Sequence, residues 1–426
     1  MPGRFLYHAW RRTHHFGSCM LPRMRNGGVV LGRRVHVFAQ LVLACGLASG
    51  CQSRNDSAAS AQKDDAKATQ PSTQDTKPAP QPAAAATPLP APAPPPPAPE
   101  APHATVQRTR EMMGTIIQMT VLDVPEDRAG PVLDEAMAEM KRLENLLSEW
   151  REDSEISQIN RAAGLHPVKV SKETLDNVRV GLEVSRWSDG AFDLSWAALR
   201  GLYLFQPGKE RVPTDAELAE RLPLVNYKNI VLDEKAGTVF LKRKGMLLGT
   251  GGIAKGYALE KAADILERAG FKSFMFFGGG QVVVRGKKGN RPWRVGVQHP
   301  RMDDYFAFVE AERGSIATSG DYEHAFLRDG QRWHHIIDLK TGRPVQHTSA
   351  VTVISDSPFY ADAIDTALFI MGPDRALAKL ATAPGPKGDM LLVGSDMRLV
   401  VSPGMKDRLI MRMQVTDGKL PAGTKP

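Results

Sequence analysis

The sequence predicts an α+β fold, with mixed and largely antiparallel sheets packed against helices, preceded by a signal peptide and a disordered linker. Three observations support this class. Runs such as GTIIQMTVLDV (114–124) alternate apolar and polar residues as strands do. Other segments place apolar residues at helical spacing, and a long alanine- and proline-rich stretch has neither pattern. Because some strands follow one another as hairpins, with helices interspersed, we expect an α+β rather than a doubly wound domain.

Residues 1–50 have the pattern of a lipoprotein signal peptide region. Arg33 and Arg34 precede an apolar run, VHVFAQLVLACGLASG, that is too short to serve comfortably as a spanning helix. Small residues precede Cys51, which predicts lipidation of Cys51 and a membrane-anchored protein facing the periplasm or the cell exterior. Cleavage at Cys45 and an uncleaved anchor are the alternatives. The candidate start positions are Met1, Met20 and Met24.

Residues 51–104 are predicted to be a flexible tether that begins at the lipidated cysteine. The composition, which culminates in PLPAPAPPPPAPEAP, cannot bury enough apolar surface to fold, and its prolines favour an extended chain. Such a tether would hold a folded domain away from a membrane. The alternative is a PxxP ligand for a recognition module.

Charge and cysteine content exclude several classes of function. Residues 1–50 contain seven arginines and no acidic residue, which leaves a net charge of only +1 of the total +8 for the rest of the chain. The basic pI therefore belongs to the leader, and we expect no nucleic-acid partner. No cysteine follows Cys51, so the main domain has no disulfide, thiolate metal site or cysteine nucleophile.

The folded domain is expected over 105–415, with a C-terminal tail over 416–426. In chain order, the pattern predicts a strand at 114–124, a helix within 129–150, a helix at 171–187 and three strands within 229–249. A helix over 253–269 follows, and further strands are expected within 273–286, 293–300, 350–356 and 390–402.

The loop GTGGIAKG (249–256) leads into the helix over 253–269. Glycines let backbone N–H groups approach an anion, the helix N-terminus adds positive partial charge, and Lys255 could add a full charge. The loop has neither the GK[ST] of a P-loop nor the context of a dinucleotide-binding GxGxxG. A phosphate cradle and a purely structural turn both remain open.

The segment ADAIDTALFIMG (361–372) places two oxygen-bearing side chains on one helix face. Asp362 and Thr366 are four residues apart, so a helix brings their oxygens together. A carboxylate and a hydroxyl suit a hard cation such as Mg²⁺, which commonly also binds phosphates. In the alternative interpretation, Asp362 caps the helix and Thr366 is a core residue.

The segment 315–345 predicts two hairpin-like turns, RDGQR and DLKTGRP, around a strand that contains His334 and His335. Adjacent strand residues point to opposite faces, so at most one of the two histidines enters a given site. The preceding ATSGDY offers hydroxyls and a glycine turn that suit phosphate binding or a structural role.

Taken together, these segments resemble the ApbE family, the FAD:protein FMN transferases. The matching pieces run in order through about 105–375: MMGTIIQM, LLSEWREDSEISQIN, DGAFDLSWAALRGLY, GGIAKGYALEKA, FFGGGQVVVRG, IATSGDYEH, HHIIDLKTGRP and ADAIDTAL. The resemblance implies a transferase that binds FAD and Mg²⁺. A serine or threonine hydroxyl of an exported acceptor redox protein attacks the phosphate on the FMN side, AMP leaves, and FMN stays attached to the acceptor.

The resemblance also implies roles for individual residues. His335 is expected to be the catalytic base. The expected metal ligands are Gly252 (through its backbone carbonyl), Asp362 and Thr366. The expected contacts of the nucleotide are Met113, Trp150, Phe192, Asp193, Thr250, Lys255, Thr318, Ser319, Gly320 and Asp338.

The chain departs from the family pattern at Gly249 and Thr250, where Asp-Leu is usual, and at Gln281, where Asn or Asp is more typical. We expect the Thr250 hydroxyl to replace the lost FAD contact. Two alternative functions remain open: an FAD pyrophosphatase that releases FMN and AMP, and a non-catalytic FAD-binding lipoprotein.

Overall fold

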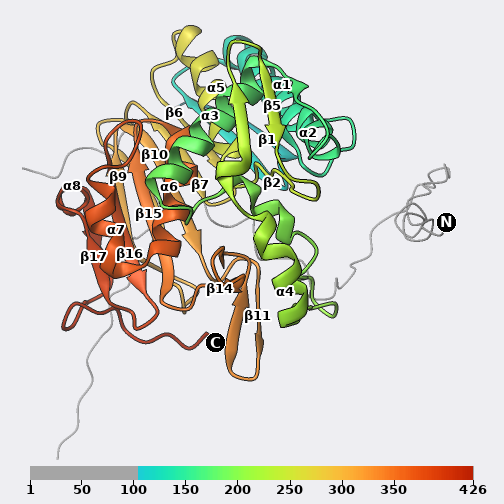
Figure 1. The fold of residues 1–426 in the computed structure, drawn as a ribbon. Coiled ribbons are helices and arrows are strands. Elements are labelled where there is room, and N and C mark those ends of the chain that lie inside the picture. Colours follow the sequence, from blue (N-terminus) through green and yellow to red (C-terminus); the bar gives the residue numbers. More distant parts are fainter. Residues whose placement is uncertain (1–103, 426) are drawn as a thin grey trace, which may run out of the picture. The chain divides into compact units, whose positions relative to one another are not determined.

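Eight antiparallel strands form the central sheet of residues 104–425, the part of the chain that the computed structural model describes (Figure 1). The predicted signal peptide region, Cys51 and the tether lie outside the described residues. The strand order is β1-β2-β6-β7-β10-β15-β16-β17, and each neighbouring pair is antiparallel. These strands are β1 Thr105–Met112, β2 Thr115–Leu122, β6 Phe274–Gly278, β7 Gln281–Arg285, β10 Arg313–Gly320, β15 Thr348–Ser355, β16 Gly388–Gly394 and β17 Leu399–Val401.

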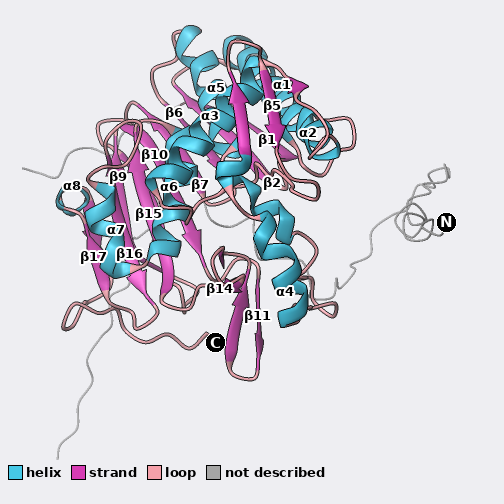
Figure 2. Cartoon of the chain, viewed as in Figure 1, coloured by secondary structure: helices cyan, strands magenta, loops and turns pink. Residues whose placement is uncertain are grey.

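Smaller sheets and helices surround this centre, and their mixture confirms the predicted α+β class (Figure 2). The smaller sheets are formed by β3 Val168–Lys169, β5 Thr238–Leu241 and β4 Ile230–Asp233; β18 Leu409–Met411, β9 Tyr305–Ala311 and β8 Trp293–Gln298; β11 Ala325–Arg328 and β12 Gln331–His334; and β13 Ile337–Asp338 and β14 Arg343–Pro344. The α-helices are α1 Glu126–Leu147, α2 Glu155–Arg161, α3 Lys172–Trp187, α4 Asp215–Arg221, α5 Ala254–Arg268, α6 Pro358–Met371, α7 Pro373–Leu380 and α8 Pro403–Lys406.

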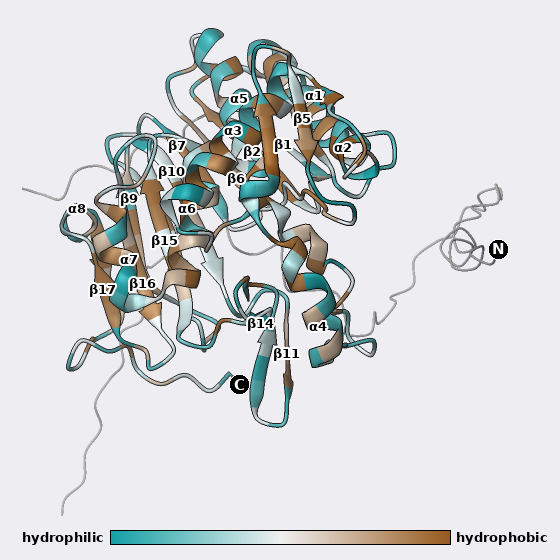
Figure 3. Ribbon diagram, viewed as in Figure 1, coloured by the Kyte–Doolittle hydropathy of each residue, from teal (hydrophilic) through white to brown (hydrophobic). Residues whose placement is uncertain are grey.

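Alternate side chains of the central sheet enter two separate apolar cores. In β15, Val351 and Val353 join the core formed with α1, α5 and α6, whereas Ala350 and Ile354 join the core formed with β8 and β9. This division follows the two-residue period of a strand. The apolar strand β15 and the apolar parts of α6 beside it are brown in Figure 3. The sheet is therefore covered by helices on one face and by the β18-β9-β8 sheet on the other.

A glycine allows α5 and α6 to approach closely. A Cβ at Gly256 would lie 2.3 Å from the carbonyl oxygen of Pro358 and 2.7 Å from the Cβ of Asp362. Such distances are far shorter than van der Waals contact, so a larger residue would force the helices apart. The close approach places the first turn of α5 directly against the Asp362 side of α6.

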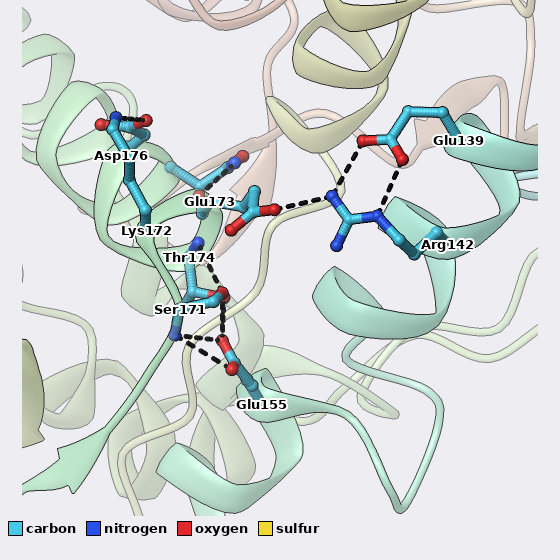
Figure 4. Close-up of polar contacts among 9 residues, drawn as sticks. Glu139, Arg142, Glu155, Ser171, Lys172, Glu173, Thr174 and Asp176 are labelled. Carbon is cyan, nitrogen blue, oxygen red and sulfur yellow. Dashed lines mark hydrogen bonds and ion pairs between the residues drawn. The ribbon is translucent and has the colours of Figure 1, made fainter. Parts of the chain in front are cut away.

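A polar network fastens α1, α2 and α3 (Figure 4). The Arg142 guanidinium of α1 bonds to Glu139 at 2.8 Å and to Glu173 of α3 at 2.6 Å. In α2, the Glu155 carboxylate accepts bonds from the Ser171 amide and hydroxyl and from the Thr174 hydroxyl, where α3 begins. These contacts join α3 to α1 and to α2, and α1 also packs against α5.

Two predictions for the domain differ from the structure. The expected third strand within 229–249 does not form, because the backbone of Leu248 bonds to the side-chain amide of Asn160 at 2.6 and 2.9 Å instead of to a neighbouring strand. Residues 416–425 of the expected tail are partly packed on the domain, with Leu420 buried and Lys419 in a β-bridge with Arg398. None of the helices within 104–425 has the length and apolarity needed to span a membrane.

Candidate active site

One edge of the central sheet brings the ends of several strands together. Gly279 and Gly280 form the β6–β7 turn, and the Gly280 carbonyl accepts a 2.9 Å hydrogen bond from the Thr318 amide near the end of β10. The same turn lies against β2, since a Cβ at Gly279 would come within 2.8 Å of the Thr115 hydroxyl oxygen. Met113, whose φ of 53° lies in the left-handed region, forms the tip of the β1–β2 turn beside this edge. The predicted contact at Met113 therefore lies near that at Thr318.

The glycine loop before α5 is held by segments from two other parts of the chain. The Gly249 amide donates to the Leu194 carbonyl at 2.8 Å, and the Trp196 indole donates to the Gly249 carbonyl at 3.2 Å. Thr250 is buried, and its hydroxyl donates to the Leu147 carbonyl at the end of α1 at 2.6 Å. The Thr250 hydroxyl thus helps to hold the loop, and the FAD contact expected of it stays a prediction.

The backbone carbonyl of Gly252 has no helical hydrogen bond. In a regular helix the Gly256 amide would bond to it, but this amide donates instead to Oδ2 of Asp362 at 2.8 Å. The other amides at the start of α5 donate to the carbonyls of Thr250 and Ile253. Within residues 104–425 no hydrogen bond reaches the Gly252 carbonyl. This oxygen is therefore free for another partner, as a metal ligand requires.

Lys255 and Asp362 join α5, α6 and β7 in one polar cluster. The Lys255 ammonium lies 2.5 Å from Oδ1 of Asp362 and 2.8 Å from Oε1 of Gln281. The Gln281 amide nitrogen in turn donates to the Ser315 hydroxyl at 2.9 Å and to the Pro358 carbonyl at 2.8 Å. Two of the predicted site residues are thereby brought into contact. Gln281, which the sequence marked only as a departure from the family pattern, holds Lys255 in place.

Thr366 and Ser319 meet one turn further along α6. Their hydroxyl oxygens are 3.2 Å apart, so the predicted metal ligand on α6 and the predicted nucleotide contact on β10 are neighbours. The sequence analysis overlooked Asp365, which is only 3 % exposed and accepts a 3.2 Å hydrogen bond from the Thr366 hydroxyl. Burial, and then the negative charge of Asp362, raise the pKa of Asp365 to about 8. The spacing of Asp362, Asp365 and Thr366 in an otherwise apolar helix was the available signal.

Thr318 lies on the opposite face of the sheet from Ser319. Ile316 and Thr318 share the face toward β8 and β9, and the Thr318 hydroxyl pairs with that of Thr352 at 2.9 Å. The Thr318 and Ser319 side chains therefore point away from each other, because successive residues of a strand point in opposite directions, and the nucleotide contacts expected of both stay predictions. Gly320 makes room for an aromatic ring, since a Cβ there would lie 2.6 Å from the Tyr322 ring.

The two adjacent histidines have opposite environments, as the strand alternation predicted. His334 is fully buried, with its Nε2 2.6 Å from the Val345 carbonyl and its ring 5.8 Å from that of Phe369 on α6. His335 is exposed, and its ring lies edge-on to His324 at 5.3 Å. Protein atoms around the His335 ring, together with His324 and His334, lower its pKa, so the imidazole is neutral at pH 7. Because solvent still reaches the side chain, desolvation of the ring is incomplete.

No contact within residues 104–425 links His335 to the Lys255–Asp362 cluster. The structure places β12 beside α6 through His334 and Phe369, but it leaves His335 free on the other face. A ligand between them would be needed to connect the predicted base with the predicted metal ligands.

Asp193 and Asp338, two of the expected nucleotide contacts, accept hydrogen bonds from backbone amides of the domain. Asp193 is buried, and its carboxylate accepts bonds from the Ser195 amide at 2.8 Å and the Tyr227 amide at 2.7 Å. Burial raises the pKa of Asp193. The Asp338 carboxylate accepts a 2.9 Å bond from the Lys340 amide and so shapes the β13–β14 turn. Both carboxylates therefore shape loops of the domain, and the nucleotide contacts expected of them stay predictions.

Trp150 and Phe192 differ in accessibility. Trp150 is 70 % exposed, and the Arg200 guanidinium lies 4.9 Å above its ring and donates to the Glu149 carbonyl at 2.6 Å. A core role for this indole is excluded, and its ring is available for stacking. Phe192 is buried, with its ring 3.1 Å from the position of a Cβ at Gly252. The Phe192 ring therefore packs against the glycine loop at Gly252.

Comparisons with known proteins identify relatives that match most of the described domain. The model of the ApbE family matches residues 113–387. An FAD:protein FMN transferase from Klebsiella pneumoniae is 32 % identical over 272 residues, which cover 62 % of this chain and 78 % of that protein. The crystal structure of the ApbE protein from Thermotoga maritima aligns with a TM-score of 0.66 and 30 % identity, covering 72 % of this chain and 99 % of that one. The flavin transferase ApbE from Vibrio cholerae aligns with a TM-score of 0.62 and 26 % identity, covering 72 % and 100 %.

Proposed function

The chain belongs to the ApbE family, and from this premise we propose that it transfers FMN from FAD to a hydroxyl of an acceptor protein. The names of its relatives, FAD:protein FMN transferases and a flavin transferase, support the transfer of FMN as the reaction. We further propose that the acceptor group is a serine or threonine hydroxyl of an exported redox protein and that AMP is the second product.

One observation carries this assignment more than any other. The Asp362 carboxylate receives the Lys255 ammonium at 2.5 Å and the Gly256 amide at 2.8 Å. It thus joins the helix that follows the glycine loop to a segment 106 residues later. A positive helix N-terminus, a lysine and a carboxylate at one point suit a phosphate group accompanied by a cation.

The oxygen set at this point fits a hard divalent cation such as Mg²⁺. The Gly252 carbonyl is free of hydrogen bonds within the described residues, Asp362 is largely buried, and the Thr366 hydroxyl lies on the same helix face. We propose that these three groups hold the cation. When bound, it would neutralise the charge of the FAD phosphates during transfer.

We propose that other residues of the chain bind FAD and accept the proton of the acceptor hydroxyl. Lys255 moves from Asp362 to a phosphate oxygen, and the exposed Trp150 ring stacks on an aromatic ring of FAD. Neutral His335 accepts the proton of the acceptor hydroxyl as its oxygen bonds to the FMN phosphorus. The bond from that phosphorus to the bridging oxygen breaks, and AMP leaves with that oxygen.

We propose that the protein acts at a membrane surface outside the cytoplasm. The motif ending at Cys51 supports lipidation, and the alanine- and proline-rich stretch over 51–104 supports a tether of adjustable reach. A tethered domain could reach an acceptor on the same membrane.

A single assay separates this function from its alternatives. The purified protein is incubated with FAD, Mg²⁺ and a candidate acceptor, and the acceptor mass and free AMP are measured. We expect acceptor that has gained FMN and an equal amount of AMP. AMP without a modified acceptor would identify a pyrophosphatase, and intact, tightly held FAD would identify a non-catalytic binding protein.

A further inference from the structure

A cavity of about 430 Å³ lies beside the hairpin of β11 and β12, and none of the roles described above uses it. Arg332 and His334 line it from β12, since alternate residues of a strand share one face. Arg301 and Asp321 line it from outside the hairpin. The cavity therefore contains two guanidinium groups and a buried carboxylate.

The Arg332 guanidinium enters this cavity without a hydrogen bond. Its side chain is only 16 % exposed, yet within residues 104–425 none of its guanidinium N–H groups has an acceptor. Its one ion pair in that range is a distant one, with Nε 3.8 Å from Oδ2 of Asp321. An arginine has five side-chain N–H donors, and a charge removed from water is costly unless it is paired and hydrogen-bonded.

Asp321 is already engaged by the other arginine. The two terminal nitrogens of Arg301 donate to the two carboxylate oxygens of Asp321 at 2.7 and 2.6 Å. Burial and the charge of Arg301 lower the pKa of Arg332, but a guanidinium still stays protonated at pH 7. Two positive charges therefore share one carboxylate, and the donors of Arg332 are available to a ligand.

The other groups of the cavity favour a singly charged anion. Asp329 lines it from the exposed turn of the hairpin, so its negative charge disfavours a dianion such as phosphate. Burial lowers the pKa of His334, which therefore adds no positive charge at pH 7. A carboxylate carries a single charge, and its two oxygens match the planar guanidinium in two parallel hydrogen bonds.

We propose that this cavity binds a carboxylate group, which Arg332 holds through two hydrogen bonds. The carboxylate belongs to a small organic acid or to an acidic side chain of the acceptor protein, and only the second source rests on the proposed function. A bound carboxylate would fix β12, the strand that leads directly to His335.

Acetate binding by the purified protein without FAD tests this site. Saturation-transfer NMR gives the dissociation constant of acetate for the wild type, Arg332→Gln and Arg328→Gln. We expect Arg332→Gln to weaken acetate binding by about 10- to 100-fold, as the loss of hydrogen bonds between charged groups does. Arg328→Gln removes the same charge from the same hairpin, but Arg328 lies over the Phe326 ring at 5.3 Å, so its loss should leave acetate binding unchanged.

The KM for the acceptor in the transfer assay identifies the source of the carboxylate. A KM that rises in Arg332→Gln, together with competition between acetate and the acceptor, assigns the carboxylate to the acceptor. An unchanged KM assigns it to a small acid. The acetate measurement needs no transfer, so it decides the inference even if the proposed function fails.

Equal acetate binding by the wild type and Arg332→Gln, or equal losses in Arg332→Gln and Arg328→Gln, would overturn the proposal. If the wild type bound no acetate, the proposal would stand only if Arg332→Gln raised the KM for the acceptor; otherwise it fails. Arg332→Lys keeps the charge without the planar fork and should bind acetate with intermediate affinity. Thermal unfolding of both Arg332 variants verifies that a loss of binding does not arise from unfolding.

Discussion

The ammonium of Lys255 lies 2.5 Å from Oδ1 of Asp362, although 107 residues separate them in the chain. Both side chains are largely buried, and Oδ2 of Asp362 accepts the Gly256 amide. The contact exists because Gly256 lets α5 and α6 approach until their backbones nearly touch. It joins the Lys255 ammonium to a carboxylate of α6 at the place where we propose that a phosphate and a metal ion bind.

Replacing the central carboxylate should abolish transfer while the fold survives. Asp362→Asn keeps the shape of the side chain but removes the charge that would bind the cation, so we expect FMN transfer to fall by at least ~100-fold. Acceptor mass after incubation with FAD and Mg²⁺ measures the effect. Far-ultraviolet circular dichroism should match that of the wild type; a collapsed fold would instead support a purely structural role in helix packing.

Ser319 and Thr318 are adjacent on β10 but point to opposite faces of the sheet, so substitutions of the two can be compared directly. The Ser319 hydroxyl contacts Thr366 at 3.2 Å, whereas the Thr318 hydroxyl points to the other core and contacts Thr352. We expect Ser319→Ala to lower kcat/KM by roughly 5-fold, the value of one hydrogen bond. Thr318→Val should leave kcat/KM unchanged and slightly alter stability. Equal losses from the two variants would contradict the assignment of the cleft to the Ser319 face.

The two histidines should respond differently to substitution. His335→Asn is expected to reduce transfer by about 10²- to 10⁴-fold, as loss of a general base does, with little change in the unfolding midpoint. His334→Asn should chiefly lower that midpoint, because His334 is buried against Val345 and Phe369. If His335→Asn retained full activity, another group would have to accept the proton.

The pH dependence of transfer tests the state of His335. Its surroundings lower the pKa of the imidazole below the usual 6.5. A base works in its neutral form, which persists as pH falls until the lowered pKa is reached. We expect kcat/KM to hold near pH 6.5 and to fall only at lower pH. A decline centred above pH 6.5 would be inconsistent with His335 as the base.

The role of Trp150 in stacking on FAD can be tested against Leu165, an apolar side chain of equal exposure. Trp150 and Leu165 are both 70 % exposed. Trp150→Ala should weaken FAD binding by roughly 5-fold, equivalent to about 1 kcal/mol of aromatic stacking. Leu165→Ala should not change it. Fluorescence titration with FAD gives both constants, and equal binding by Trp150→Ala and the wild type would remove Trp150 from the site.

A single added methyl group should separate the helices that carry the site. Gly256→Ala places a Cβ 2.3 Å from the Pro358 carbonyl oxygen, and we expect a loss of about 2 kcal/mol in the free energy of unfolding. Alanine is the better helix former by about 1 kcal/mol, so packing must outweigh propensity for this result. Urea unfolding measures the difference, and a more stable variant would show that the helices can move apart without cost.

The periodic pattern of apolar residues was sufficient to predict most helices and strands of the fold. The helix expected over 171–187 is α3, that over 253–269 is α5, and both predicted hairpins at 325–345 form. The third strand expected within 229–249 does not form, because the side chain of Asn160, 88 residues away, bonds to the backbone of Leu248 in place of a neighbouring strand. No periodicity within the segment contains that information.

The sequence by itself determined the α+β class, the positions of the motifs and the oxygen-bearing pair Asp362 and Thr366, because strand and helix periods are local properties of the chain. Only the tertiary structure decided which of these groups meet. It directed the side chains of Thr318 and Ser319 to opposite faces of the sheet, bonded Thr250 to the end of α1, and buried the carboxyl group of Asp365. Burial and long-range contact depend on how helices and sheets pack, which a single sequence does not state.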